Sequence, residues 1–454
     1  MMREGTLRRK LARRLHLFSD DRASVVYDRQ GFQAFGVDRG HYVALRRFLA
    51  GSDLSAACAA AGTNPVALAE TVTAILAPPA TSDAEASTEP EKPGLDRLVL
   101  NVSNDCNLRC LYCYAEGGAY GAPRGRMPEE VALASAARAV EFFGSIGTVQ
   151  FFGGEPLLNV PVIDRVCRWF EEQAAAGVID KLPRFGIVTN GTLLTEEAAA
   201  VLNRHNIAST VSLDGPRDVT DALRGEGTFD AVAAYVARMS GEGRIVDIES
   251  TFTKLHLDTG YDLPVVMEFL REEFGAREVH IPWVSLPPGH PLAIDEDELV
   301  ASYTAGTRLS LQSMADGRPV ILSLVKRMID ALSKHAPSQV YCPAGVNTLA
   351  VAADGWWYPC FMFVGRSDLR MFNAATGEGE DGQVEQVSQL IRTANDGSLQ
   401  PCADCWARGL CSGCLGADLA STGDLLQKAG CEVRRAMARE VVIGAVSMCL
   451  PSAI

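Results

Sequence analysis

Hydrophobic and polar residues repeat with two different periods between residue 97 and about residue 310. Short runs rich in β-branched residues alternate with longer stretches that are apolar on one helical face. This alternation indicates βαβ units, a parallel sheet and right-handed crossovers. The predicted strands are Leu98–Ser103, Val149–Phe152, Phe185–Thr189, Thr210–Leu213, Ile248–Thr253 and Val279–Val284, and the helical stretches include Pro128–Phe143, Pro161–Ala175, Thr195–Asn203 and Leu263–Phe274. Six such units predict a partial (β/α)6 barrel of the α/β class, with its chemistry at the carboxyl ends of the strands.

The first 77 residues predict a separate small module. Ser24–Tyr27 and Phe32–Val37 have the pattern of two short strands, and three helical stretches follow them. The last of these begins with Asn64 as N-cap and Pro65 in the first turn. Two strands and three helices suffice for a winged-helix-like α+β fold. The basic first 16 residues either bind an acidic partner or form a solvated helix face.

Composition marks the other boundaries. Residues 78–94 are small, acidic and interrupted by proline, which is typical of a flexible linker. From residue 341 the chain becomes rich in cysteine and glycine. The predicted organisation is a module at 1–77, a linker at 78–94, a partial barrel at 95–314, a bridge with one helix at 315–340, a cysteine-rich domain at 341–435 and a helix with a tail at 436–454.

Length and charge exclude several classes of protein. With 454 residues the chain is too long for one compact domain. Its net charge of −14 argues against a nucleic-acid-binding surface. No apolar run is long enough to span a membrane, and the basic N-terminus lacks the apolar stretch of a secretion signal. We therefore expect a cytoplasmic protein without nucleic-acid or membrane partners.

Ten of the 13 cysteines fall into two clusters with spacing typical of metal ligands. In the reducing cytoplasm such clusters bind metal or do redox chemistry more often than they form disulfides. Cys106, Cys110 and Cys113 follow the first predicted barrel strand with C-x3-C-x2-C spacing. Three thiolates in one loop can hold three irons of a cubane cluster and leave the fourth iron open to a small molecule. A structural zinc site needs a fourth ligand.

This loop resembles the signature of radical S-adenosylmethionine (radical SAM) enzymes. The resemblance implies that Cys106, Cys110 and Cys113 hold a catalytic 4Fe–4S cluster whose open iron is chelated by SAM. An electron passed to SAM then releases methionine and a 5′-deoxyadenosyl radical, which abstracts a hydrogen atom from the substrate. The chemistry belongs to the cofactor, and the protein positions it and excludes water.

The resemblance extends to the other strand ends. The sequence Gly153-Gly154-Glu155-Pro156 after the second strand matches the family motif for the SAM amino group. In related enzymes the residues that match Ser212 and Arg224 hold the SAM ribose and carboxylate, and an aromatic residue at the position of Tyr112 contacts the adenine. The residues expected to bind the cofactor are Tyr112, Gly153, Gly154, Glu155, Asn190, Ser212, Asp214 and Arg224.

The second cluster comprises Cys342, Cys360, Cys402, Cys405, Cys411, Cys414 and Cys431. Taken alone, the segment from Cys402 to Cys414 fits zinc as well as iron–sulfur. The whole set resembles a SPASM domain, which carries auxiliary 4Fe–4S clusters, although the family usually has three residues, not two, before the position of Cys414. The resemblance implies an outer cluster on Cys402, Cys405, Cys411 and Cys431, an inner cluster on Cys342, Cys360 and Cys414, and three 4Fe–4S clusters in all.

With three protein ligands, the inner cluster would have an iron open to a substrate thiolate, unless Cys449 supplies the fourth ligand. Cys58 and Cys167 lie on helical stretches and are expected in the core. Trp356-Trp357-Tyr358 either lines a substrate channel or packs against its neighbours. His205, His256, His280 and His290 lack ligand spacing and are interpreted as structural.

Two functions share this architecture. Sulfatase-maturating enzymes carry an Asp directly after the position of Cys360, and this Asp acts as a base. This chain has Phe361 at that position. Maturases of ribosomally made peptides often begin with a leader-binding (PqqD-like) module, and residues 1–77 resemble it. The run from Cys113 to Gly121 also resembles thioether-forming maturases. We therefore predict an oxidoreductase that modifies a precursor peptide carrying a leader, forms a Cys thioether, and receives electrons from a donor such as flavodoxin or ferredoxin.

Other reactions would need nearly the same enzyme. They are carbon–carbon cross-linking, epimerisation or backbone excision of a peptide, and anaerobic sulfatase-type maturation. An iron–sulfur electron carrier and a peptide-binding scaffold with structural zinc are the alternatives without catalysis. Only a protein that uses SAM needs Gly153–Glu155, Ser212 and Arg224, so these residues separate the two groups.

Overall fold

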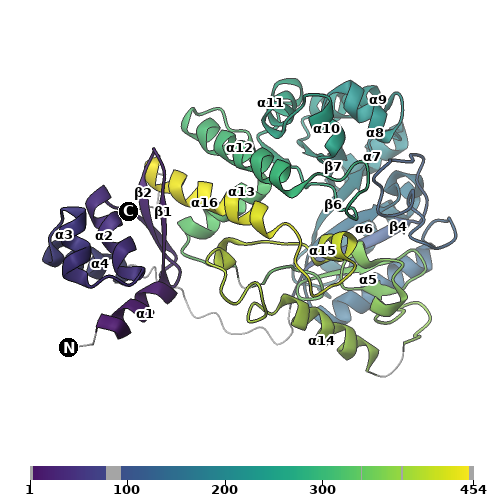
Figure 1. Cartoon of the computed structure of the whole chain (residues 1–454). Helices are drawn as coiled ribbons and strands as arrows, with labels where there is room; N and C mark the ends of the chain where they lie inside the picture. The colour runs from purple at the N-terminus through teal and green to yellow at the C-terminus, as the bar shows by residue number, and fades with distance from the viewer. Residues whose placement is uncertain (1–3, 78–93, 339, 380–381, 449–454) are drawn as a thin grey trace.

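The computed structural model describes residues 4–77, 94–338, 340–379 and 382–448. The chain forms a small N-terminal module, a large sheet with its helices and a cysteine-rich C-terminal region, and the last helix lies between the module and the rest (Figure 1). All but the last residue of the expected linker, and Cys449, lie outside the described residues. In the described parts of the chain, no helix combines the length and the apolar character that crossing a bilayer requires.

The N-terminal module contains an antiparallel three-stranded sheet with the order β1–β2–β3. The strands and three helices predicted there are present, and the side chains of Asp38, Asp53 and Asn64 cap the helices. The first helix and strand were not predicted. Only Leu11 of the first helix is buried, so its apolar pattern is weak. The elements are α1 (Glu4–Arg14), β1 (Leu15–Ser19), β2 (Ser24–Asp28), β3 (Gln33–Gly36), α2 (Arg39–Leu49), α3 (Leu54–Ala61) and α4 (Pro65–Leu76).

The two faces of this small sheet belong to different cores. Val26 packs with Leu45 and Phe48 in the core of the module itself. Val25 and Tyr27, on the opposite face of the same strand, belong to the main core of the chain. Strands β1 to β3 contact α16 (Cys431–Ser447) there. The module is therefore packed directly onto the C-terminal helix.

Within the described residues, the main sheet has nine strands in the order β10-β9-β8-β7-β6-β5-β4-β11-β12. All neighbouring pairs are parallel except β11 with β12. The six predicted barrel strands are its centre, and the sheet also takes one strand from the expected bridge and two from the cysteine-rich region. The strands are β4 (Leu95–Ser103), β5 (Ile146–Gly153), β6 (Arg184–Thr189), β7 (Ala208–Ser212), β8 (Val246–Glu249), β9 (Glu278–His280), β10 (Ile321–Leu322), β11 (Thr348–Val351) and β12 (Trp357–Tyr358).

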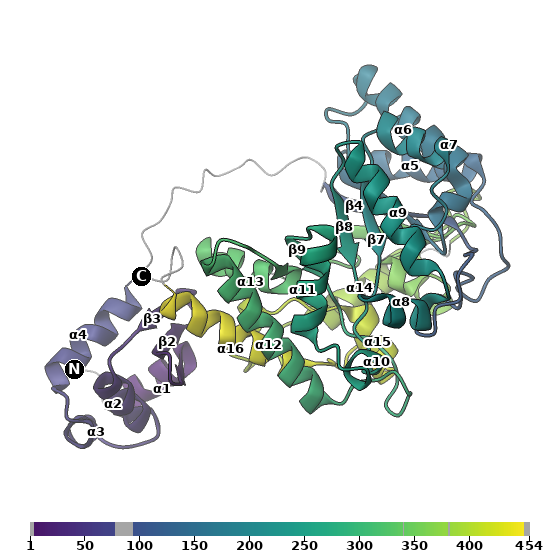
Figure 2. The same ribbon diagram turned by 90° about the horizontal axis from the view of Figure 1, so that it is seen from above.

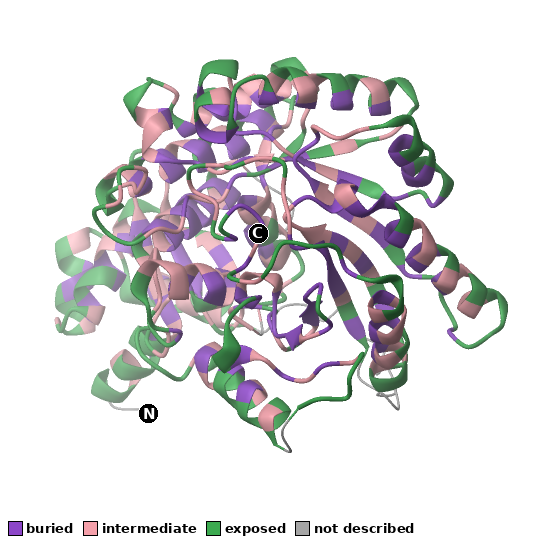
Figure 3. Cartoon of the chain, turned by 90° about the vertical axis from the view of Figure 1, so that its right-hand side faces the viewer, coloured by how far each residue is buried: buried purple, intermediate pink, exposed green. Residues whose placement is uncertain are grey.

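The connecting helices cover the outer face of this sheet (Figure 2), and buried residues follow the strands and the inward sides of the helices (Figure 3). The α-helices are α5 (Glu129–Phe143), α6 (Val160–Ala175), α7 (Glu196–Arg204), α8 (Arg217–Arg224), α9 (Thr228–Gly241), α10 (Lys254–Asp258), α11 (Leu263–Phe274), α12 (Glu296–Ala315), α13 (Ser323–Ser333), α14 (Gln383–Asn395) and α15 (Leu415–Thr422), before α16. Short 3-10 turns span Pro156–Asn159, Phe361–Phe363, Ser367–Leu369 and Arg408–Leu410.

Candidate functional site

The loop that carries the first three cysteines packs on the carboxyl end of β5. Gly154 N donates to Ser103 O (2.8 Å), and Glu155 N donates to Asp105 O (2.8 Å). A Cβ atom on Gly153 would lie 2.3 Å from Ser103 O, and one on Gly154 would lie 2.2 Å from Asp105 O. Gly153 also has a φ of +134°, which L-residues rarely adopt. The two glycines thus let the cysteine loop approach the strand end.

On its other side the loop is attached to α8. Leu111 N donates to Leu223 O (2.9 Å), and the Tyr112 hydroxyl donates to Asp214 Oδ2 (2.7 Å). Arg224 binds both oxygens of Asp214 through Nε (2.8 Å) and Nη2 (2.9 Å). Burial raises the pKa of Tyr112 far above its ordinary value, so the hydroxyl remains a donor. Three of the residues expected at the cofactor site therefore form one network.

Glu155 is fully buried and points toward β6. Its carboxylate accepts hydrogen bonds from Leu157 N (2.9 Å), Thr189 Oγ1 (2.7 Å) and Asn190 N (2.8 Å). Burial raises the pKa of this carboxyl to about 7. The side chain thus ties the ends of β5 and β6 together, a role that the sequence pattern did not predict.

Asn190 faces the cysteine loop. Its Nδ2 donates to Asn107 Oδ1 (2.9 Å) and to Cys106 Sγ (3.6 Å). Leu108 N donates to the same sulfur (3.4 Å). Cys106 is therefore the cysteine of this loop with two hydrogen-bond donors on its sulfur. Such donors tune iron–sulfur sites.

The three loop cysteines are close enough that the charges of Cys106 and Cys113 act on Cys110, whose pKa burial raises to about 11. Within the described ranges, no three His, Cys, Asp or Glu side chains gather closely enough to hold one metal ion. A cubane cluster binds each thiolate through a different iron and does not need such a gathering. The glycine cradle leaves the backbone of the strand end open to a cluster with a polar cofactor beside it.

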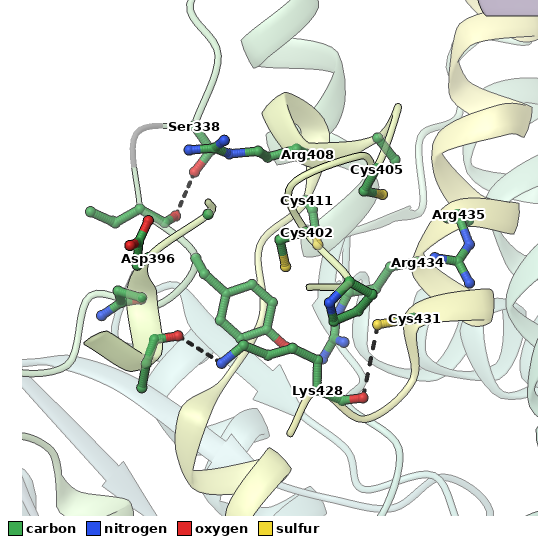
Figure 4. A pocket seen from close by; sticks show the side chains of 17 residues that line it. Ser338, Asp396, Cys402, Cys405, Arg408, Cys411, Lys428, Cys431, Arg434 and Arg435 are labelled. Atoms are coloured by element: carbon green, nitrogen blue, oxygen red, sulfur yellow. Dashed lines mark hydrogen bonds between the residues drawn. The ribbon is translucent and has the colours of Figure 1, made fainter. Parts of the chain in front are cut away.

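Four cysteines of the second cluster line one pocket, Cys402, Cys405, Cys411 and Cys431 (Figure 4). The buried side chains of Lys428 and Arg434 line the same pocket. Arg434 lies over the rings of Trp283 (5.2 Å) and Tyr341 (5.5 Å), and Lys428 Nζ donates to Ala394 O (2.7 Å).

The buried acid facing these cations is Asp418, whose Oδ2 is 3.9 Å from Lys428 Nζ and accepts no hydrogen bond. Burial raises the pKa of Cys411 to about 12. Thiolates here need a bound metal as well as the two cations, and the surplus of positive charge fits an anionic thiolate–metal centre.

The other three cysteines of the second cluster meet beside β12. A hydrogen bond joins the sulfurs of Cys342 and Cys414; it raises the pKa of Cys342 and lowers that of Cys414 to about 6. The charge of Cys414 also acts on Cys360. Phe361 packs against Phe152 of β5, with ring centroids 4.5 Å apart. In the structure, the seven cysteines thus form one group of four and one group of three.

Charged residues on the inner face of the sheet were not singled out in the sequence. Glu249 and His280 end β8 and β9 in register, opposite the buried Ile248 and Val279. His280 Nδ1 lies 2.8 Å from Ser323 Oγ. The charge of Arg97, on β4, acts on both His280 and Cys360, although four strands separate β4 from β9. The sheet therefore curls around this face. In the sequence, the signal that could have pointed to these residues was the alternation of charged and apolar side chains on short strands.

Several predicted structural residues are where the sequence placed them. Cys58 and Cys167 are fully buried in the two cores. His205 is buried between Asp164 and Glu171, and Trp357 is buried beneath Phe372.

Comparisons with known proteins show which family and which proteins this chain is similar to. Residues 100–270 match the family model of the Radical SAM superfamily. An uncharacterized protein of Archaeoglobus fulgidus is 27% identical over 75% of this chain and 79% of its own. The cysteine-type anaerobic sulfatase-maturating enzyme of Clostridium novyi is 24% identical over 60% and 74%. The Fe-coproporphyrin III synthase of Methanosarcina barkeri is 30% identical, but the match spans 39% of this chain and 41% of the relative. These names cover different reactions.

Two solved structures share the fold. Native anSMEcpe with bound AdoMet and Cp18Cys peptide has a TM-score of 0.63 at 19% identity, over 76% of this chain and 96% of its own. Streptococcus suis SuiB bound to precursor peptide SuiA has a TM-score of 0.55 at 15% identity, over 92% and 98%. Both folds agree with the family match. They also agree with the curled parallel sheet of this chain, in which Cys106, Cys110 and Cys113 follow the carboxyl end of β4. In sequence, residues 100–270 of this chain are therefore similar to the Radical SAM superfamily, and the fold of this region agrees with that similarity.

Proposed function

We propose that this chain modifies a ribosomally synthesised precursor peptide by radical chemistry. The observation that carries the proposal is the approach of the SAM-type cysteine loop to the inner cysteine group. Tyr114 and Tyr120 pack edge to face (6.1 Å), Tyr120 donates to Gly153 O (3.0 Å), and the charge of Cys360 acts on Tyr114. The two cysteine groups thus lie on either side of a pair of tyrosines. A substrate lying there would contact both.

Cys106, Cys110 and Cys113 would hold the cluster that binds SAM. When bound, this group supplies a radical that removes a hydrogen atom from a carbon of the substrate. The chain's own contribution is positional. The Tyr112–Asp214–Arg224 network fixes the loop against α8, and Glu155 and Asn190 fix it against β6.

The bond formed is proposed to be a thioether. Cys342, Cys360 and Cys414 are three ligands, which leaves room for the sulfur of a substrate cysteine at the inner centre. Phe361, packed on Phe152, offers no carboxylate to act as a base there, which disfavours sulfatase-type maturation. Carbon–carbon cross-linking, epimerisation and backbone excision remain the competing reactions on the same scaffold.

Residues 1–77 are proposed to bind the leader of the precursor. Their three-stranded sheet ends in β1 and β3, each paired on one side. An extended peptide can add to such an edge by main-chain hydrogen bonds. The fold shared with SuiB, whose solved complex contains a precursor peptide, covers 92% of this chain and so extends into residues 1–77.

The test combines cofactor chemistry with peptide mass. The anaerobically reconstituted chain should form 5′-deoxyadenosine from SAM, and the triple variant Cys106→Ala/Cys110→Ala/Cys113→Ala should not. Co-expressed short peptides encoded beside the gene should lose two hydrogen atoms and one alkylatable thiol. Epimerisation would leave the mass unchanged, and excision would remove backbone atoms. SAM cleavage by the triple variant would refute the proposal.

A further inference from the structure

Helix α1 carries a concentration of positive charge that is unusual for a chain with a net charge of −14. Two of its five cations are used within the module. Arg14 binds Asp28 through Nε (2.7 Å), and Arg8 donates to Ser52 O (2.6 Å). The other three, Arg9, Lys10 and Arg13, are exposed, and they form no ion pair with any carboxylate of the described residues. Their spacing puts them on one helix face.

This face is joined to the pocket of four cysteines. The Arg29 guanidinium donates to Arg13 O through Nη1 (3.4 Å) and to Cys405 O through Nη2 (3.1 Å). Shortly after α1, the ring of His16 stacks on the ring of Trp406, with centroids 4.9 Å apart and an interplanar angle of 14°. One arginine side chain therefore spans the distance between the basic helix and a backbone carbonyl of the cysteine pocket.

The rim of the pocket adds to the charge. Arg408 is exposed and lines the pocket, and its charge acts on Cys402. Arg435 also lines it but pairs with Glu432. Asp396 lines the pocket as well and accepts hydrogen bonds from Ser398, and Asp404, next to Cys405 in the chain, accepts one from Gln400. Among the residues that line the pocket itself, four are cations (Arg408, Lys428, Arg434 and Arg435) and one, Asp396, is a carboxylate.

We propose that Arg9, Lys10, Arg13, Arg29 and Arg408, named here the basic rim, dock an acidic electron-transfer protein of the flavodoxin or ferredoxin class. The partner in its reduced form would lose one electron, and the centre held by Cys402, Cys405, Cys411 and Cys431 would gain it, with no bond made or broken. Complementary charge suits such transient partners because it speeds encounter without requiring a large apolar interface. The inference rests on the proposed function in one respect, that these four cysteines hold an iron–sulfur cluster.

The experiment measures binding first and catalysis second. An acidic flavodoxin serves as the probe, and its Kd for the reconstituted full chain is measured at low and high salt. Arg9→Glu/Arg13→Glu reverses charge on the exposed face of α1. Lys181→Glu/Arg318→Glu, at exposed positions of the barrel and the bridge, is the control with the same change in net charge.

Binding of the probe should weaken about tenfold or more in the first variant and with added salt, and stay near wild type in the control. SAM cleavage driven by reduced flavodoxin should slow in parallel, while cleavage driven by dithionite should be unchanged. Equal losses in both variants, salt-independent binding, or binding of a poly-glutamate peptide in place of flavodoxin would overturn the proposal. Failure of the proposed function is distinguishable, since it abolishes dithionite-driven cleavage and leaves the binding comparison intact.

Discussion

Arg224 and Asp214 form a buried ion pair in which both carboxylate oxygens accept hydrogen bonds from the guanidinium, at 2.8 and 2.9 Å. Asp214 also accepts from Tyr112 and from Thr251 N (3.0 Å). Burial alone would lower the pKa of Arg224, but the Asp214 charge raises it. One carboxylate thus holds together the ends of β7 and β8, helix α8 and the cysteine loop.

Asp214→Asn should therefore destabilise the chain and weaken SAM binding. Removing one partner of a buried pair costs about 3–5 kcal/mol, because the remaining charge is left uncompensated. The free energy of unfolding and the SAM Kd are the measurements. Asp230→Asn is the control, since its two-bond pair with Arg217 is exposed, and it should change little. Similar losses in both variants would contradict the assigned role.

Glu155 should give stability a pH dependence of a particular sign. Burial raises its folded pKa to about 7, above the usual value for a glutamate. Between these two values the folded state holds a proton that the unfolded state has released, so stability falls as pH rises through this window and levels off above it. The size is roughly 3 kcal/mol. Glu155→Gln should lack this slope, which urea unfolding at a series of pH values would measure; an identical slope would count against it.

Asn190→Ala should lower the reduction potential of the cluster at Cys106, Cys110 and Cys113. The variant loses the amide donor to Cys106 Sγ, and hydrogen bonds to cluster sulfurs favour the reduced, more negative state. Redox titration followed by electron paramagnetic resonance reads this potential without any substrate. Asn107→Ala, which removes the neighbouring amide but no donor to sulfur, should leave it nearer the wild-type value. A shift of equal size in both variants would assign the effect to loop disorder.

Gly154→Ala should prevent correct assembly of the cysteine loop. The added methyl group would lie 2.2 Å from Asp105 O and 2.6 Å from its carbonyl carbon, and backbone atoms cannot yield cheaply. We expect a loss of about 1–3 kcal/mol and fewer irons per chain after reconstitution. Gly125→Ala, in the same loop, meets no atom within 4 Å and should reconstitute normally.

The metal content of the reconstituted chain distinguishes iron–sulfur clusters from zinc in the cysteine-rich region. Three cubanes predict about twelve irons per chain, and two predict about eight. Four irons with one or two zincs would keep the radical SAM domain and make the C-terminal region a zinc scaffold. Ser substitutions at Cys402 and Cys405 should remove about four irons and leave SAM cleavage by dithionite in place.

The sequence predicted what depends on local pattern. Strands β4 to β9 and helices α5, α6, α7 and α11 lie within a few residues of their expected bounds, because their periodicity is strong. Strands β10 and β12 have two residues each and take their pairing from distant chain. The pairing of Arg224 with Asp214 and the turn of Glu155 toward β6 are tertiary events. A sequence motif can identify the functional residues, but it does not predict which side chains they contact in the folded chain.

The sheet of the N-terminal module shares its second face with α16, and that helix begins at Cys431. Removing residues 1–77 would expose apolar side chains of the C-terminal helix, such as Val446, which lies against Gly36, as well as delete the proposed binding surface. Point variants at the sheet edge are therefore the sound way to study leader binding. If the proposed peptide binding by the module and the proposed metal binding at Cys431 are coupled through α16, each strengthens the other by the same factor, because free-energy coupling is reciprocal.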